Sequence, residues 1–143
     1  MSHLIRKAQV WIANVSGKEI TRVLLFKVVD VRGGGWHPVT GGVDAGETFL
    51  DGAKRELEEE TGFKSKDGSW VKLNHKVHFE GRYGAVEEHS FLFVLDGKRR
   101  DPKLDPSEHL VFEWIEIHEA QQRLTFDGQQ DALRCVSDIL KTR

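Results

Sequence analysis

The segment of residues 41–63 constrains the chain most, because it joins a glycine-rich loop to a helix rich in carboxylates. A helix is predicted over residues 48–61. Thr48 and Asp51 form a variant of the N-terminal capping box, and Gly62 has the position of a C-cap glycine. Both ends of this helix are therefore marked in the sequence.

The apolar side chains of this helix form one stripe, and two of its acids border that stripe. At about 100° per residue, the stripe consists of Leu50, Ala53 and Leu57. Glu56 and Glu60 fall beside it, and Glu59 lies a little further round. Like charges three or four positions apart cost roughly 0.2–0.5 kcal/mol each in an exposed helix, and partial burial increases the repulsion. Arg55 can neutralise only part of this cluster, whereas Mg²⁺ takes oxygen ligands of this kind and keeps positions for water and phosphate.

The same segment has a fixed spacing of glycines, acids and one arginine. The order is Gly41, five residues, Glu47, seven residues, Arg55-Glu56-Leu57, one residue, Glu59-Glu60, one residue, Gly62 and Phe63. This pattern fills every fixed position of the Nudix box, and the chain resembles the Nudix hydrolase family over nearly its whole length. The resemblance implies an α/β fold of the Nudix type, an α/β/α sandwich with a mixed β-sheet and helices on both faces.

The family resemblance also implies an activity, the hydrolysis of a nucleoside diphosphate linked to another group with Mg²⁺ or Mn²⁺ as cofactor. The implied catalytic residues and metal ligands are Glu56, Glu59 and Glu60. Glu59 is in addition a candidate for positioning or deprotonating the attacking water.

Other residues of the box have structural roles by the same resemblance. Glu47 and Arg55 form a pair that ties the loop to the helix, and Gly62 ends the helix. Gly41 and Gly42 let the loop turn tightly beside the substrate.

Two segments outside the box are similar to the subgroup of nucleoside triphosphate and dihydroneopterin triphosphate pyrophosphohydrolases. They are residues 36–41, Trp-His-Pro-Val-Thr-Gly, and residues 108–110, Glu-His-Leu. The similarity implies that Glu108 is a further metal ligand, for which Glu87 or Glu88 is the alternative. It also places Trp36 where a base or pterin ring can stack.

The sequence marks the basic residues that would bind the substrate phosphates less clearly than it marks the carboxylates. Many family members have an Arg pair after the second strand, whereas here Lys27 is followed by two valines, so that Lys27 and Arg32 are the candidates. His37 and His109 are candidates for substrate contact or for packing, since each neighbours a segment of the predicted site.

The remaining patterns predict an α/β layered domain over residues 1–143. Alternating or β-rich runs predict strands over residues 8–15, 21–29, 70–79, 87–95 and 110–117. Helical patterns predict two more helices over residues 118–124 and 128–141. The connections at residues 16–19 and 81–84 have the composition of a hairpin turn and a loop.

Composition excludes several classes of protein. The 21 basic and 23 acidic residues nearly cancel, which argues against general nucleic-acid binding. No stretch approaches about 18 apolar residues, so no membrane association is expected. The lone Cys135 suits a reducing compartment, and we expect a cytoplasmic protein. Members of the family are often dimers, and the residues leave homodimer formation open.

The sequence thus predicts a Mg²⁺-dependent pyrophosphohydrolase that converts a nucleoside or pterin triphosphate to the monophosphate and pyrophosphate. A second hypothesis keeps the chemistry and changes the substrate to ADP-ribose, a dinucleoside polyphosphate or an RNA 5′ end. A third is a nucleotide-binding sensor without turnover.

Overall fold

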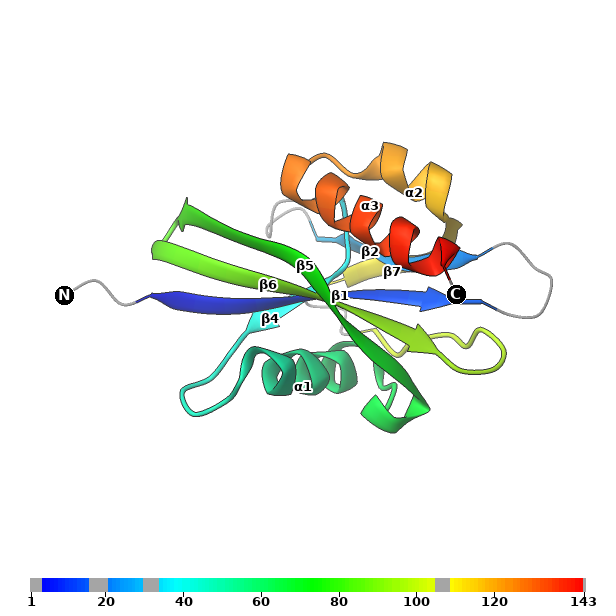
Figure 1. Ribbon diagram of the computed structural model, residues 1–143, viewed down its shortest axis with the longest axis horizontal. Helices are drawn as coiled ribbons and strands as arrows, with labels where there is room; N and C mark the ends of the chain where they lie inside the picture. The colour runs from blue at the N-terminus through cyan, green and yellow to red at the C-terminus, as the bar shows by residue number, and fades with distance from the viewer. Residues whose placement is uncertain (1–3, 16–20, 30–33, 105–108, 143) are drawn as a thin grey trace.

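The chain forms one mixed β-sheet with helices on both faces, as Figure 1 shows. The computed structural model describes residues 4–15, 21–29, 34–104 and 109–142. The strands are β1 (Ile5–Asn14), β2 (Arg22–Val28), β3 (Trp36–His37), β4 (Val39–Gly42), β5 (Gly68–Gly81), β6 (Gly84–Leu95) and β7 (His109–Glu116). The helices are α1 (Phe49–Thr61), the short 3₁₀ helix η2 (Ser65–Asp67), α2 (Ile117–Arg123) and α3 (Asp127–Lys141).

Strand β1 is the centre of the sheet. It runs parallel to β6 on one side and antiparallel to both β4 and β2 on the other, with β4 beside its first half and β2 beside its second. Strand β5 extends the sheet beyond β6, and β7 and β3 extend it around β2. The sheet is mixed because the β1–β6 pair is parallel while the other pairs are antiparallel.

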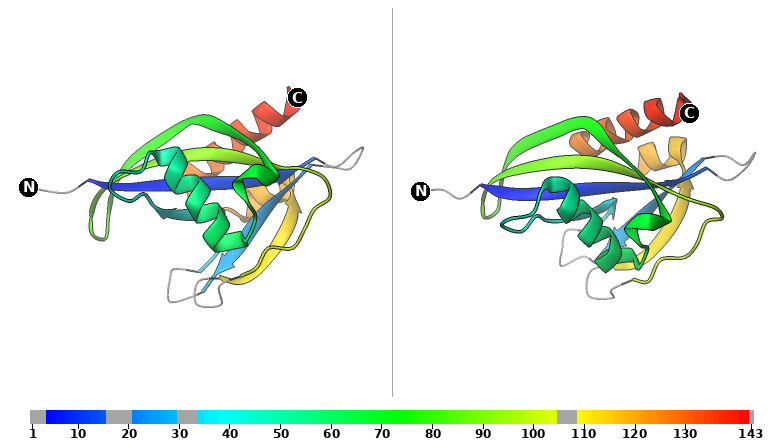
Figure 2. Two further views of the ribbon diagram at one scale, coloured as in Figure 1. Left: turned by 90° about the horizontal axis from the view of Figure 1, so that it is seen from below. Right: turned by 60° about the horizontal axis from the view of Figure 1, so that its bottom comes forward.

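Alternation along β1 divides the core into two layers. Trp11 and Ala13 face the layer under α2 and α3, whereas Val10 and Ile12 face the layer under α1. All four side chains are fully buried. The two helical layers lie on opposite sides of the sheet in both orientations of Figure 2, so the predicted α/β/α sandwich is confirmed.

Helix α1 begins and ends where the sequence predicts. Thr48 is the N-cap and exchanges hydrogen bonds with Asp51 in a complete capping box. At the other end, Gly62 takes a φ of +77°, in the left-handed region that favours glycine, and its N–H donates to the carbonyl of Glu58. Both ends are thus satisfied by local hydrogen bonds.

The sequence patterns predicted no strand at β3 or β4, and Gly41 and Gly42 of β4 were expected to lie in a loop. Both are short, and β4 contains two glycines, so neither has an alternating apolar pattern. The connection predicted at residues 16–19 lies outside the described residues. No helix in the described part of the chain is long and apolar enough to span a bilayer.

Candidate active site

One carboxylate of α1, that of Glu56, lies against β4 at the point where that strand has a glycine. Glu56 and Glu60 are one turn apart on α1 and are only 9% and 8% exposed. A Cβ atom on Gly41 would overlap the carboxyl group of Glu56. Gly41 is therefore required for the close approach of this carboxylate to the strand, a more specific role than a tight turn.

Arg55 holds the loop and the acidic face of α1 together. Its Nε and Nη2 atoms donate to the two carboxylate oxygens of Glu47 at 3.0 and 2.9 Å, and Nη2 also donates to the carbonyl of Gly42 at 2.7 Å. Its Nη1 atom donates to Glu56 at 2.9 Å. The two-pronged contact with Glu47 is the pairing expected for these two motif residues.

This network changes the acid–base properties of its members. The hydrogen bonds from Arg55, and then that from the backbone N–H of Asp44, lower the pKa of Glu47 to about 2. The hydrogen bond to Glu47 in turn raises the pKa of Arg55. Glu47 and Arg55 are therefore a fixed ion pair at every physiological pH.

Glu59 differs from its neighbours in exposure. Its side chain is 56% exposed, and one carboxylate oxygen lies 3.3 Å from Nη1 of Arg55. Glu58, in contrast, interacts with Lys64 and belongs to the other side of the helix. Glu59 is thus open to water at the rim of the Arg55 network, whereas Glu56 and Glu60 are enclosed.

The carboxylates fit some metal ions and not others. Within the described residues, no group of three or more His, Cys, Asp or Glu side chains could hold an ion on its own. A complete cage for zinc or calcium is therefore not found there. Mg²⁺ is usually held by one or two carboxylates together with water and substrate phosphates, and the two enclosed side chains Glu56 and Glu60 have oxygen ligands of that kind.

A cavity of about 580 Å³ lies on the opposite face of the sheet, beside α3. Thr40 of β4 lines it, and the next residue, Gly41, faces Glu56. Two exposed aromatic side chains also line it, Phe79 from β5 (44% exposed) and Phe126 from the segment before α3 (57% exposed). The cavity therefore has the volume and the aromatic lining of a site for a planar ring.

The two alternative acids on β6 occupy different faces. Glu88 lines the cavity, accepts a hydrogen bond from Gln9 and has its pKa raised by burial. Glu87 lies on the other face, where contact with His89 at 2.7 Å lowers its pKa. Neither is drawn into a cluster with Glu56.

The other predicted site residues are dispersed. His37 lines the cavity, but Trp36 packs at its edge in β3 with the guanidinium of Arg123 5.0 Å from its ring centre. Lys27 is exposed on β2, paired with Trp36 across the strands. Arg32 and Glu108 lie outside the described residues, and the side chain of His109 does too.

Sequence reasoning missed the residues that face the cavity from distant elements. Phe79, Phe126 and Gln129 were not singled out, because nothing in the spacing of these residues relates β5 to the start of α3. An aromatic residue just before a helix, such as Phe126, was the only local signal.

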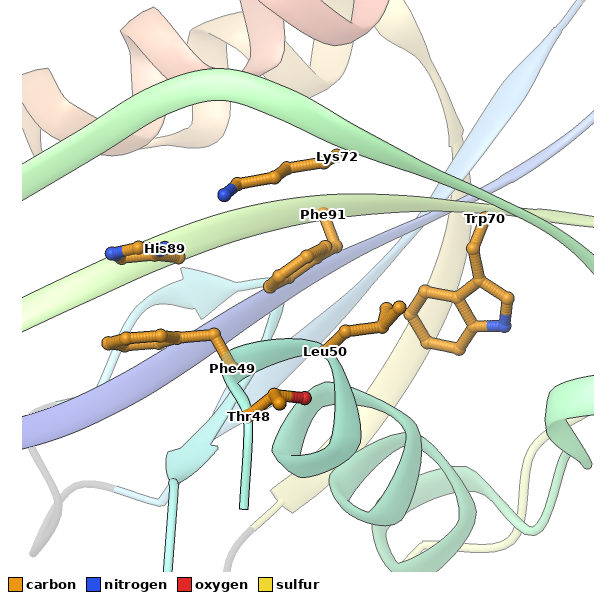
Figure 3. A pocket seen from close by; sticks show the side chains of 7 residues that line it. All are labelled: Thr48, Phe49, Leu50, Trp70, Lys72, His89 and Phe91. Carbon is orange, nitrogen blue, oxygen red and sulfur yellow. The ribbon is translucent and has the colours of Figure 1, made fainter. Parts of the chain in front are cut away.

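A second cleft of about 310 Å³ lies between the start of α1 and strands β5 and β6, as Figure 3 shows. Its walls are mostly apolar, with Phe49 stacked on His89 at a ring separation of 3.6 Å and Phe91 and Trp70 beyond them. Lys72 extends over it. No carboxylate is found among the described residues that line this cleft.

Comparisons with known proteins agree with the site. The NUDIX domain model matches residues 5–135. An octanoyltransferase from Myxococcus xanthus is 35% identical over 117 residues, which are 79% of this chain but only 31% of that protein. An RNA pyrophosphohydrolase from Erythrobacter litoralis is 30% identical over 118 residues, 72% of this chain and 71% of that protein.

A solved structure of similar fold is a C. elegans Ap4A hydrolase binary complex, with a TM-score of 0.82, 21% identity and coverage of 97% and 99% of the two chains. The chain therefore belongs to the Nudix family of hydrolases, enzymes that act on diphosphate linkages.

Proposed function

We propose that this protein is a Mg²⁺-dependent pyrophosphohydrolase of a nucleoside triphosphate or a similar ring-bearing triphosphate, releasing the monophosphate and pyrophosphate. The observation that carries the proposal is the position of β4. One residue of this strand, Gly41, admits the Glu56 carboxylate, and its neighbour Thr40 lines the ring-sized cavity. A substrate with an aromatic ring and a phosphate chain matches this arrangement, because the ring fits the cavity and the phosphates can lie beside the carboxylates of α1.

We assign the carboxylates of α1 to the part of the site that binds the substrate phosphates. Glu56 and Glu60 would hold the cation, with Glu59 as the third ligand or as the group that positions and deprotonates water. Bound Mg²⁺, or Mn²⁺ in its place, would neutralise the phosphate oxygens that otherwise repel a nucleophile. The exposure of Glu59 supports its role toward water, because a general base must reach the proton that it removes.

Arg55 is assigned a positioning role. Its hydrogen bonds fix the Glu56 carboxylate relative to the Gly42 carbonyl and to Glu47, so the helix and loop move as one unit. Lys27 and Arg32 remain the proposed cations for the phosphate chain, and Glu108 the proposed further ligand.

We assign Phe79 and Phe126 to the part of the site that binds the substrate ring. They line the cavity from β5 and from the segment before α3, and both expose a large part of their apolar surface. Stacking of a base or pterin between them would remove this surface from water. Trp36, which has the guanidinium of Arg123 5.0 Å from its ring centre, remains the alternative stacking residue.

A triphosphorylated RNA 5′ end is the second candidate substrate. It is favoured by the similarity to the RNA pyrophosphohydrolase, which shares 30% identity with this chain. The bond cleaved is of the same kind, so the acidic site is unchanged and only the occupant of the cavity differs.

The experiment compares four proteins with Mg²⁺ and a panel of nucleoside triphosphates, dihydroneopterin triphosphate, Ap4A, ADP-ribose and a 5′-triphosphorylated RNA. They are the wild type and the variants Glu60→Gln, Glu59→Gln and Glu58→Gln. We expect release of pyrophosphate or phosphate by the wild type and by Glu58→Gln, and a loss of at least about 10²-fold in the other two. Chelation of the metal should stop turnover, and added Mg²⁺ or Mn²⁺ should restore it.

Two results would overturn the proposal. Turnover of no substrate by the wild type would favour a nucleotide sensor. Equal activity of Glu60→Gln and Glu58→Gln would show that the acidic face of α1 does not hold the metal.

A further inference from the structure

Arg6 of β1 spans the two ends of the turn that leads into α1. Its Nη2 atom donates to the carbonyl of Asp44 at 2.7 Å, and its Nη1 atom donates to the carbonyl of Glu47 at 2.9 Å. The backbone carbonyl of Arg6 also accepts a hydrogen bond from the N–H of Val43 at 2.9 Å. Three hydrogen bonds therefore join the central strand of the sheet to the loop between β4 and α1.

The turn that Arg6 spans determines where the Glu47 carboxylate lies. The N–H of Glu47 donates to the carbonyl of Asp44 at 3.0 Å, and the N–H of Asp44 donates to the Glu47 carboxylate at 2.8 Å. That carboxylate also accepts the two hydrogen bonds from Arg55, whose Nη1 atom donates to Glu56. A series of hydrogen bonds thus runs from Arg6 through the turn and Arg55 to the enclosed carboxylate of Glu56.

An aromatic ring also restrains the guanidinium of Arg6. Its Cζ atom lies 5.5 Å from the ring centre of Phe49, the first residue of α1. The ring of Phe49 is stacked on His89 of β6, with a ring separation of 3.6 Å and an angle of 3° between the two planes (Figure 3). A guanidinium that packs on an aromatic ring and donates from two of its nitrogens has little freedom to rotate.

Arg6 donates to neutral carbonyls and not to an acid. Within the described residues it forms no ion pair, although Glu87 is its partner across the parallel strands β1 and β6. Glu87 instead contacts His89 at 2.7 Å. The contribution of Arg6 is therefore geometric, and the planar fork of arginine suits two carbonyls, whereas lysine has a single nitrogen.

We propose that Arg6 is a positioning residue for the hydrolysis, because by fixing the turn of residues 44–47 it sets the place of Arg55 and of the Glu56 carboxylate. The inference rests on the proposed function, which assigns the metal ion to the carboxylates of α1. Arg6 lies outside the motif of residues 41–63, so the motif does not mark it. The acidic site is then held from two sides, by Arg55 on α1 itself and by Arg6 on β1.

The first test measures kcat and KM for the best substrate of the panel. Arg6→Met keeps a long side chain and removes every donor, whereas Arg6→Lys keeps the charge and removes the fork. We expect kcat to fall about 10-fold in both variants, with KM within about twofold of the wild type. The matched control is Arg134→Met, which removes an exposed guanidinium on α3 and its ion pair with Asp131 and should change neither constant.

Two further measurements do not depend on turnover. Mn²⁺ binding, followed by electron paramagnetic resonance, should be about 10-fold weaker in both Arg6 variants than in the wild type and in Arg134→Met, because loss of a group that orients a metal ligand weakens metal binding. Amide hydrogen exchange at Val43 and Glu47 should be faster in the Arg6 variants, because the turn that protects these N–H groups opens more often. Unchanged exchange in α3 would show that the variants are folded. If Arg6→Met does not fold, Arg6→Lys alone decides the test.

Four results would overturn the inference. Wild-type kcat in Arg6→Met would show that the turn holds without the guanidinium. Wild-type kcat in Arg6→Lys would show that charge matters and the fork does not. A higher KM with unchanged kcat would show that Arg6 binds the substrate itself. Unchanged Mn²⁺ affinity in both variants would separate Arg6 from the carboxylates.

The failure of the proposed function has a different signature. A wild type that turns over no substrate, but whose Mn²⁺ affinity falls on substitution of Arg6, would contradict the proposed activity and leave the role of Arg6 standing. A wild type that does not bind Mn²⁺ at all would overturn both.

Discussion

Substitution of Gly41 by alanine isolates the contact on which the acidic site depends. Gly41 has no positive φ, so the backbone accepts alanine without strain. The added methyl group would overlap the carboxyl carbon of Glu56, and carbon atoms prefer separations of about 3.5–4.0 Å. The Glu56 carboxylate or β4 must therefore move by roughly 1 Å or more, and the hydrogen bond from Arg55 to Glu56 must lengthen or break.

The expected loss of stability is that of an overpacked site, about 1–3 kcal/mol. For a chain of this size that is a fall in Tm of roughly 3–10 °C. Displacement of a catalytic carboxylate by about 1 Å should lower kcat by around 10²-fold. The assays are thermal unfolding by circular dichroism and pyrophosphate release with the best substrate of the panel.

The adjacent glycine provides the control for stability. A Cβ atom on Gly42 meets nothing within 4 Å, and its φ is not positive either. Gly42→Ala shares the entropic effect of replacing a strand glycine but not the clash, so the difference in Tm between the two variants measures the clash itself. Equal Tm values for Gly41→Ala and Gly42→Ala, or wild-type turnover in Gly41→Ala, would refute the reasoning.

Three further predictions concern stability. The depressed pKa of Glu47 means that its charge stabilises the fold above about pH 4.5 and that this contribution is lost as pH falls toward 2, so Glu47→Gln should flatten the pH dependence of urea unfolding in that window. Burial raises the pKa of Glu88, so its ionisation costs stability as pH rises, and Glu88→Gln should have a higher Tm than the wild type at pH 8, with the gap closing toward pH 4. Leu57 is fully buried under α1, so Leu57→Ala should lower the free energy of unfolding by about 2–5 kcal/mol, whereas Val111→Ala, at an exposed position, should change it little.

The parts of the fold that depend on local chemistry could be predicted from sequence. Thr48 and Gly62 mark the ends of α1 through hydrogen bonds within a few residues of each side chain. The periodicity of α3 places Ala132, Leu133 and Val136 in the core, and they are buried. Helix capping and amphipathicity depend only on residues within one segment, so the sequence of that segment is enough to predict them.

The short strands and the cavity could not be predicted in this way. Strands β3 and β4 have two and four residues and depend on pairing with β2 and β1, which are distant in sequence. Phe79 and Phe126 line one cavity only because β5 and the start of α3 lie on the same side of the molecule, and these elements are distant in sequence. The contact between Trp36 and the guanidinium of Arg123 on α2 likewise has no signature in the sequence near residue 36.

Strand β4 also restricts the kind of substrate that can reach both halves of the site. Thr40 and Gly41 are adjacent, with Cα atoms about 3.8 Å apart, but they face opposite sides of the sheet. In the described part of the chain β4 pairs only with β1, so it forms a local edge. Under the proposed function, a ring bound beside α3 and a phosphate bound through a cation at Glu56 would have to be joined by a linker that bends over this edge. A flexible polyphosphate chain can do so, and its length sets which diphosphate bond reaches the carboxylates. Under the proposed function, the number of phosphates between the ring and the cleaved bond is therefore a substrate property that this geometry would restrict.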